Sequence, residues 1–580
     1  MRIFNYHFTY LFGFALALTF SLSHYYVGGS IVLGGEGNYL LDYSENIKIA
    51  SHQWVSRFGL GSVSLSPGAN TTNLLFLVII ENLFHSDVLT NFSLIFSIYF
   101  LPFLGMYLIS NELKIKPHLC CLVSLFYVVN PFSIHFLSSL NQWNVFSISL
   151  IPILFWVVLR YYHDNLKLFL YYGSVSALFS FAYTNHPLNA IINISSILAV
   201  YIISYYYNEK FLLLEVAKKY LLVFSAFLLF NCWWLLNLFL GVGNALGIYR
   251  VDLAHDWLIS TVGEVGNPLA KSLSLTHLVG PEEQSFLGSY FHSFFSYLIC
   301  LVPIFLVVSG VFFAKRNLRK LLIHILILML IAIFLLKGAA PPLGTIYLFL
   351  FKNVPFFNIF KSSVEKFGLL YIFLLSIFLL FTILATKNHN HHKTGTVIFS
   401  GYLLFCTIPL LIGEAIPEIS LDKRFTQSRK FKEKSSHKIF RKQINNEKLE
   451  YKILSLPGTG NYQVLFDSIE GKQYSGIDPL LPNINKSTIT PHNVMEFKVF
   501  YNKFILNTEN HKLFGFFNIG KLVVNGNLYP WFGQIGPGAE KLRNRYKNLP
   551  RKNFENVSTH TILQNFIPVV HTTENLIISK

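Results

Sequence analysis

Three carboxylate residues follow the first long apolar run of the chain, in the stretch GGEGNYLLDYSENIKIASHQW. Glu36, Asp42 and Glu45 lie within ten positions of one another. A carboxylate within hydrogen-bond reach of a hydroxyl group can take its proton as a new bond forms, so these residues are candidate general bases. Glu36 lies in a Gly-rich turn, and Asp42 follows six residues later, whereas Glu45 precedes more polar sequence. We expect the base to be Glu36 or Asp42, and Glu45 to be dispensable.

Basic and aromatic residues elsewhere in the polar segments complete the set of candidate site residues. Lys361 and Lys366, in VPFFNIFKSSVEKFGLL, and Arg250 are fixed cations that can stabilise a developing negative charge. The alternative for the lysines is ordinary interfacial placement, with the ammonium group reaching water along an apolar surface. Trp54, which begins a Gly-rich connection, and His186, in TNHP, are candidate substrate contacts.

Metal and cofactor motifs are missing from the sequence. No cluster has the ligand spacing of a zinc or calcium site, and no Walker or dinucleotide-binding glycine motif occurs. The acid pair Glu36 and Asp42 has the chemistry to hold a divalent cation. We nevertheless expect no metal and no cofactor.

The elements that must position these residues are membrane helices. The chain has 580 residues, of which 53% are hydrophobic and only 13% are charged. Apolar runs of about 17 to 23 residues recur along the first 413 residues, and each is long enough to cross a hydrocarbon core as a helix. The sequence predicts about eleven spans, at 9–27, 89–110, 118–133, 143–161, 168–184, 188–207, 218–240, 291–313, 319–336, 367–386 and 396–416.

The charges between these runs predict an orientation. With a cytoplasmic N-terminus, the short inside connections contain basic stretches such as KIK and AKRNLRK, as the positive-inside rule requires. The long segments 28–88, 241–290 and 337–366 then lie outside, together with the tail. This assignment requires the short apolar stretch 71–84 to lie at the interface or to re-enter rather than to cross.

The composition changes at about residue 421. From Leu421 to Lys580 there are 24 basic and 12 acidic residues, so this tail supplies +12 of the net charge of +17. Short β-type runs, YKILSLP, YQVLFDSI, FKVFYNKFIL and KLVVNGNLYP, are bounded by Gly, Pro and Asn. We therefore expect a transmembrane domain over 1–420, with the long first loop 28–88, and an extracytoplasmic β-rich or α+β domain over 421–580.

Several motifs, in this order, resemble those of a known group of enzymes. The turn Gly35-Glu36, the later Trp54 and the Gly-rich connection are similar to the first external loop of GT-C glycosyltransferases, which use polyprenyl-phosphate sugars. The chain looks most like the membrane portion of the arabinofuranosyltransferase and YfhO-type families. Its Asn130-Pro131 pair is similar to the NP exit from a span, and FGFFNIGKLVVNGNL in the tail is similar to their strand LNVKYVVV.

The resemblance also assigns chemistry to the two lysines. VPFFNIFKSSVEKFGLL is similar to an external P..FR.P.K motif, with Lys361 at the position of the Arg, Ser363 at that of the Pro, and Lys366 in the matching basic place. The resemblance implies a GT-C-like fold and an inverting transferase whose cations bind the donor phosphate. A lysine offers a point charge where an Arg offers a bidentate fork, so we expect weaker orientation of the phosphate.

The leading hypothesis is a multi-pass cell-membrane glycosyltransferase. It would transfer a sugar from a polyprenyl-phosphate donor to an extracytoplasmic glycan or lipid-linked acceptor, with the bilayer as its other partner and no nucleic acid. A transporter or flippase of lipid-linked saccharides is the alternative, and it calls for ionisable residues at the midplane and often paired repeats. The sequence shows neither clearly. A noncatalytic cell-envelope scaffold is the third possibility.

Overall fold

The computed structural model describes most of the helical part of the chain and separate strands of the tail. It describes residues 2–33, 43–50, 54–55, 62–63, 67–138, 140, 142–208, 213–246, 255, 258, 268–279, 285–386, 391–414, 416, 418–422, 425–428, 430–432, 435–447, 451–456, 464–467, 473–476, 488–489, 519–525, 528–529, 551–554 and 557–561. The chain forms two compact units. The first contains residues 1–27 and 68–420, and the second contains residues 28–67 and 421–580.

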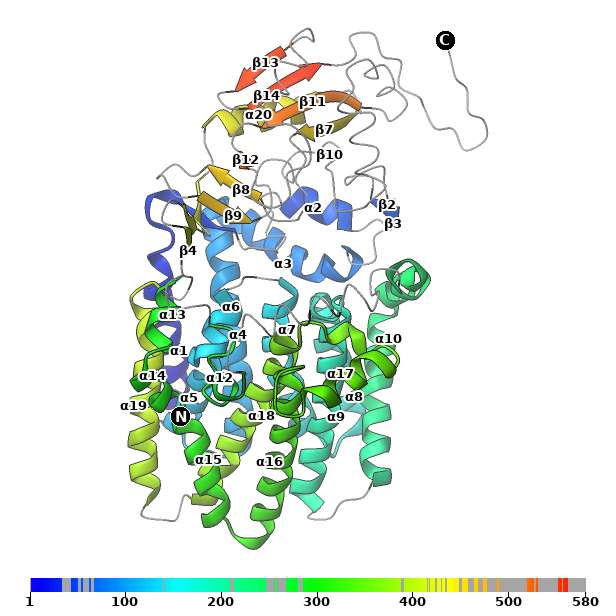
Figure 1. Ribbon diagram of the computed structural model, residues 1–580. Helices are drawn as coiled ribbons and strands as arrows, with labels where there is room; N and C mark the ends of the chain where they lie inside the picture. The colour runs from blue at the N-terminus through cyan, green and yellow to red at the C-terminus, as the bar shows by residue number, and fades with distance from the viewer. Residues whose placement is uncertain are drawn as a thin grey trace. The chain divides into compact units, whose positions relative to one another are not determined.

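The described residues of the first unit are mostly helical (Figure 1). Its longer helices are α1 (Arg2–Ser23), α3 (Pro67–Phe84), α4 (Asp87–Glu112), α5 (Pro117–Val129), α7 (Gln142–Tyr161), α8 (Asn165–Leu178), α9 (His186–Asn208), α10 (Leu213–Leu246), α15 (Val302–Phe313), α16 (Arg316–Leu336), α18 (Ser363–Thr386) and α19 (His391–Leu411). Its shorter helices are α6 (Pro131–Ser138), η2 (Ser180–Tyr183), α12 (Pro268–Leu273), α13 (Phe286–Phe291), α14 (Phe294–Cys300), α17 (Gly344–Asn353) and η4 (Phe357–Phe360).

Several of these helices are long and apolar enough to cross a membrane. Six described helices or helix pairs meet this standard: Asp87–Glu112, His186–Tyr207, Phe294–Phe313, Arg316–Leu336, Ser363–Thr386 and His392–Leu411. The pair α5 and α6 adds a seventh if it is one span. All eleven predicted ranges overlap a helix. Length and composition support about six spans in the described residues, so the count of eleven stays a prediction.

One predicted span is broken, for a reason that lies in its sequence. The range 118–133 forms two helices that meet at an angle of 55° around Asn130. Pro131 lacks an N–H group and disfavours helical backbone in the residue before it, so α5 ends at Val129 and α6 begins anew. The Asn130 side chain stabilises the break, because its Oδ1 accepts a hydrogen bond from Ser133 N at 3.0 Å.

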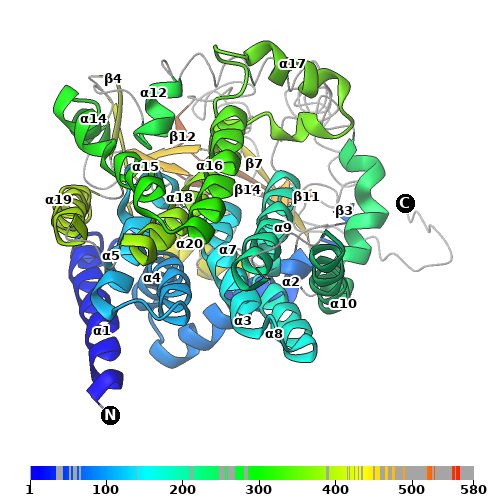
Figure 2. The same ribbon diagram turned by 90° about the horizontal axis from the view of Figure 1, so that it is seen from below.

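Helix α18 lies at the centre of the first unit. It packs against α5, α7, α9, α15, α16 and α19, and Figure 2 shows it from below, surrounded by other helices. Nearly every side chain of α18 is buried, whereas α16 and α19 keep many apolar side chains exposed. An exposed apolar stripe on an outer helix is what contact with lipid requires.

Hydrogen bonds join chain segments at the ends of the bundle. Arg160, at the end of α7, forms an ion pair with Glu112, at the end of α4, with N–O distances of 3.0 Å. Ser363 Oγ, at the start of α18, donates to the carbonyl of Leu336 at 3.2 Å. These contacts show that α4 and α7 end on one side and that α16 ends where α18 begins, as alternate crossing requires.

The second unit contains two five-stranded sheets and two short strand pairs. The strands are β1 (Ile31–Val32), β2 (Trp54–Val55), β3 (Ser62–Val63), β4 (Ile419–Asp422), β5 (Phe425–Ser428), β6 (Lys430–Phe431), β7 (Lys452–Leu456), β8 (Val464–Asp467), β9 (Gln473–Gly476), β10 (Thr488–Ile489), β11 (Ile519–Asn525), β12 (Leu528–Tyr529), β13 (Arg551–Phe554) and β14 (Val557–Thr561). The sheet orders are β10-β7-β11-β14-β13 and β12-β8-β9-β5-β4. The unit also has helices α2 (Tyr43–Ala50) and α20 (Ser435–Asn446).

A small apolar core holds α20 on the first of these sheets. Phe440 and Ile444 of α20 are buried with Tyr451, Ile453 and Val523. Three of the four predicted β patterns form strands, as β7, β8 and β11 with β12, and FKVFYNKFIL lies outside the described residues. The described residues of the tail therefore contain both helix and strand, while the β-rich or α+β extracytoplasmic domain stays a prediction.

Candidate functional site

The predicted acidic and arginine residues are only partly covered by the structure. Glu36, Asp42 and Arg250 lie outside the described residues. Glu45 lies in α2, and Trp54 lies on β2, where it is paired with Val63 of β3. The assignment of Glu36 or Asp42 as the base therefore stays a prediction.

The described flanks of the acidic stretch belong to the same compact unit as the tail. Strand β1, just before the stretch, is antiparallel to β6 of the tail, with Ile31 opposite Phe431 and Val32 opposite Lys430. Helix α2 follows the stretch, and its Tyr43 and Asn46 are buried. Sequence reasoning treated the first loop as part of the membrane domain and missed this pairing. Two-residue strands carry no pattern that identifies a partner so far away in the sequence.

The two predicted lysines lie at the end of the bundle where α16 ends and α18 begins. Lys361 directly follows η4 and is half-buried. Lys366 lies in the first turn of α18, is only 6% exposed, and forms an ion pair with Glu365 at 2.9 Å. Lys361 and Lys366 thus lie in one segment at the start of α18. The ion pair with the more exposed Glu365 occupies part of the Lys366 ammonium group.

A third lysine at this end was not predicted. Lys337 directly follows α16 and is 4% exposed. Its ammonium group donates hydrogen bonds to the carbonyl oxygens of Ala340, at 2.7 Å, and Pro342. It also lies 5.2 Å from the ring centre of Phe334. The sequence signal was available, since KGAAPPLG places a Lys between an apolar run and a Gly- and Pro-rich turn.

Lys337 is a buried cation without an acidic partner in the described part of the chain. The ion pairs of these residues involve other lysines and arginines. Burial lowers the pKa of Lys337, because removing an ammonium group from water disfavours its charged form. The two carbonyl groups stabilise the remaining charge through their dipoles, so Lys337 adds positive charge to the end of the bundle that carries Lys361 and Lys366.

Hydrogen bonds join the two ends of the segment between α16 and α18 and connect the short helices inside it. The bond from Ser363 Oγ to Leu336 O joins its two ends. Inside the segment, the hydroxyl of Tyr347 in α17 donates to the carbonyl of Phe360 in η4 at 2.9 Å, and both atoms are buried. Rings of Phe357 and Phe360 pack beside this bond. The residue after Phe360 is Lys361, so α17 directly supports the position of that lysine.

A buried histidine packs against the first turns of α18. The ring of His277 is stacked on that of Phe132, with centroids 4.9 Å apart. Gly368 makes room for both rings, because a Cβ there would lie 2.5 Å from Phe132 and 2.8 Å from His277 Nε2. Burial lowers the pKa of His277 to about 3; the backbone of Lys271 opposes the shift in part, and His135 adds to it. The imidazole is therefore neutral near pH 7 and adds no charge.

His186, the other predicted contact, begins α9 and is half-buried. The preceding residue, Asn185, caps the helix, because its side-chain oxygen accepts from Leu188 N at 3.4 Å. Helix α9 packs against η4, which Lys361 follows, and against α18, which carries Lys366. A substrate contact by His186 stays a prediction.

No group of three or more His, Cys, Asp or Glu side chains that could hold a metal ion occurs among the residues described above. The acid pair with the chemistry for a divalent cation, Glu36 and Asp42, lies outside them.

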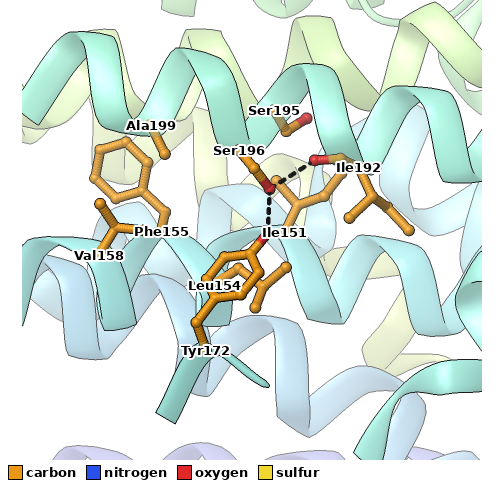
Figure 3. Close-up of a pocket in the computed structure, with 9 residues that line it drawn as sticks. All are labelled: Ile151, Leu154, Phe155, Val158, Tyr172, Ile192, Ser195, Ser196 and Ala199. Atoms are coloured by element: carbon orange, nitrogen blue, oxygen red, sulfur yellow. Dashed lines mark hydrogen bonds between the residues drawn. The ribbon is translucent and has the colours of Figure 1, made fainter. Parts of the chain in front are cut away.

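A gap between α7, α8 and α9 is an apolar packing defect rather than a substrate site. Figure 3 shows its lining, with Ser196 Oγ bonded to the Tyr172 hydroxyl at 2.7 Å and to Ile192 O at 2.9 Å. The remaining lining is almost entirely apolar, and the space does not admit a water molecule. A sugar, with many hydroxyl groups, has neither room nor partners there.

The described residues form a mostly helical chain with about six helices apolar enough to cross a membrane, and the fold is GT-C-like. Among solved structures, the chain is similar to arabinofuranosyltransferase AftD from Mycobacteria, with a TM-score of 0.61 at 11% identity over 98% of this chain. Two structures of a mutant AftD match with TM-scores of 0.61 and 0.56 at 10% and 12% identity, over 97% and 96% of this chain.

The likeness concerns the fold, and it covers only part of the known enzyme. The chain spans 40% to 42% of the length of the AftD chains that it matches. No protein-family profile matches the chain, and no curated protein matches its sequence.

Proposed function

We propose that the chain is a membrane glycosyltransferase that transfers a sugar from a polyprenyl-phosphate donor to an extracytoplasmic glycan or lipid-linked acceptor. The observation that carries this proposal is the fold: nearly the whole chain superposes on part of an arabinofuranosyltransferase, with a TM-score of 0.61. The basic end of the bundle supports it, since a polyprenyl-phosphate leaving group is an anion at the membrane surface.

The proposed reaction is a single displacement. Glu36 or Asp42 takes the proton of the acceptor hydroxyl as its oxygen attacks the anomeric carbon. The bond from that carbon to the phosphate oxygen breaks on the opposite side, so the configuration inverts. Lys361 stabilises the charge that develops on the phosphate, with Lys366 and Arg250 as further candidates. Trp54 and His186 are proposed sugar or phosphate contacts.

The orientation belongs to the same proposal. The N-terminus is placed in the cytoplasm, and the domain from about 421 onward outside, because the short basic connections follow the positive-inside rule. A Cys introduced at Ser475 in β9 should react with an impermeant maleimide added to intact cells. Labelling only after the membrane is opened would show that the orientation is wrong.

Transfer by the purified full-length chain in nanodiscs tests the function. A panel of radiolabelled polyprenyl-phosphate sugars, beginning with the arabinofuranose donor, is incubated with oligosaccharide acceptors, and the product is separated from the lipid. A product that forms with wild type and is lost in Lys361→Met supports the proposal. Proteoliposomes that move the lipid-linked sugar across the bilayer without transfer would favour a flippase instead, and neither activity would favour a scaffold.

A further inference from the structure

The segment between α16 and α18 is built from strained turns that require support. Both of its short helices begin after a non-glycine residue in the left-handed region: Leu343, with φ 64°, precedes α17, and Phe356, with φ 65°, precedes η4. Side chains with a Cβ rarely adopt this conformation, and it persists where surrounding contacts hold it. Backbone hydrogen bonds contribute to the first turn, and one side chain supplies two further contacts to its carbonyl groups.

Lys337 is that side chain. Its ammonium group donates to Ala340 O and Pro342 O, so it binds the turn immediately before Leu343 from the inside. The turn also packs closely against α18, because a Cβ on Gly338, with φ +58°, would lie 2.6 Å from Ser363 Oγ. A buried cation bound to two carbonyl groups fixes the turn more strongly than neutral hydrogen bonds would.

A chain of contacts leads from this turn to Lys361. The turn sets the start of α17, and Tyr347, in the first turn of that helix, donates to the carbonyl of Phe360. Phe360 also packs on Phe367 of α18, with ring centroids 4.8 Å apart. Lys361 is the next residue. The side chains that carry this chain of contacts, Lys337, Tyr347 and Phe360, are all buried.

We propose that Lys337 is a positioning residue, which sets the place of Lys361 through the turn 338–343 and helix α17. This inference rests on the proposed function, since it takes Lys361 to contact the donor phosphate. Lys337 itself does not touch the substrate. The positioning role explains why the charged side chain of Lys337 is buried at a place where the described residues offer it no carboxylate.

Hydrogen exchange of the full-length chain in nanodiscs tests, without any ligand, whether Lys337 holds the turn 338–343 and the start of α17. Lys337→Met keeps the length of the side chain and removes its donors. We expect exchange of the backbone amides of 338–349 to rise about 10-fold to 100-fold, with α16 and α18 unchanged. Lys352→Met, a change of an exposed lysine on the same helix α17, is the matched control and should leave exchange unaltered. Unchanged protection in Lys337→Met would overturn the proposal.

A double-mutant cycle tests whether Lys337 affects phosphate binding through Lys361. Polyprenyl phosphate is the probe. Lys337→Met should weaken its binding about 10-fold in wild type and less than about 2-fold in the Lys361→Met background, because the effect acts through Lys361. If Lys337→Met does not fold, Tyr347→Phe replaces it in the cycle, because it removes the hydrogen bond to Phe360 O with little change in volume. Its loss of binding should likewise be smaller in the Lys361→Met background than in wild type. Equal losses in both backgrounds would overturn the positioning role. A wild-type chain that does not bind polyprenyl phosphate would reject the proposed function, while the exchange data would still decide the positioning.

Discussion

The lysine segment (residues 336–368) and the first-loop segment (residues 28–67) acquire their structure in opposite ways. In the lysine segment, hydrogen bonds join residues that lie close in sequence, such as Lys337 with Ala340 and Tyr347 with Phe360. In the first-loop segment, β1 pairs with β6, so that Ile31 lies opposite Phe431, about 400 residues away.

This difference separates two parts of the proposed reaction, the binding of the donor phosphate and the transfer of the acceptor proton. The cations belong to a helical bundle whose central helix is nearly fully buried, and their segment closes on itself. The candidate bases lie between β1 and α2, in a unit that also contains the tail. Donor binding should therefore depend on the bundle, whereas proton transfer should depend on the tail as well.

The largest expected effect comes from removing the tail. A chain truncated after Ile416 lacks β6, so β1 loses its partner, and transfer should fall by at least about 10,000-fold because the base is no longer positioned. Binding of polyprenyl phosphate, measured in nanodiscs, should remain within about 3-fold of wild type. Lost binding with the bundle still folded would contradict this separation, and so would retained transfer.

Amide replacements of the acids should have the next largest effect. Glu36→Gln or Asp42→Asn preserves shape and removes the proton acceptor, so one of them should lower kcat about 100-fold to 10,000-fold with donor affinity much less affected. Glu45→Gln is the matched control and should be near wild type. The measurement is transfer from a matched polyprenyl-phosphate sugar at saturating donor. If all three variants turn over normally, the base lies elsewhere.

Replacing the lysines should have a smaller effect, and the two should differ. Lys361→Met should weaken polyprenyl-phosphate binding about 10-fold to 100-fold, as the loss of a charged hydrogen bond does. Lys366→Met should cost less, because Lys366 is already paired with Glu365. The ratio of the two dissociation constants is the measurement. A larger loss for Lys366→Met would show that the ion pair opens to bind the phosphate.

The smallest effect tests packing around α18. Gly368→Ala places a Cβ 2.5 Å from the Phe132 ring, and overpacking of this kind costs about 1 to 3 kcal/mol in the free energy of unfolding. Gly401→Ala, on α19, meets no atom within 4 Å and is the control. Thermal unfolding of both variants in detergent gives the comparison. Equal midpoints would mean that His277 and Phe132 shift readily, and that this end of the bundle is loosely packed.

Part of the candidate site could be read from the sequence. The order of the motifs predicted Lys361 and Lys366 as phosphate contacts, and that role stays a prediction; the structure places both lysines where α18 begins, near the end of α16. Lys337 was missed because the residue type alone does not distinguish a buried lysine from an interfacial one. Its burial depends on a turn that folds back over its ammonium group.

The sequence by itself determined that the chain forms apolar helices near the predicted ranges. In lipid no water is present to bond the backbone, and a single helix satisfies all of its backbone hydrogen bonds internally. Pro131 also causes the break between α5 and α6, although the range 118–133 was predicted as one span, and the change of composition near residue 421 precedes the strands of the tail. Only the tertiary structure decided that the first loop shares a compact unit with the tail, and that Lys337 is buried with its ammonium group on two carbonyl oxygens. The physical reason is the separation in sequence between the bonded residues. Helical hydrogen bonds join residues four apart, whereas β1 and β6 are far apart in the chain and neither sequence identifies the other as its partner.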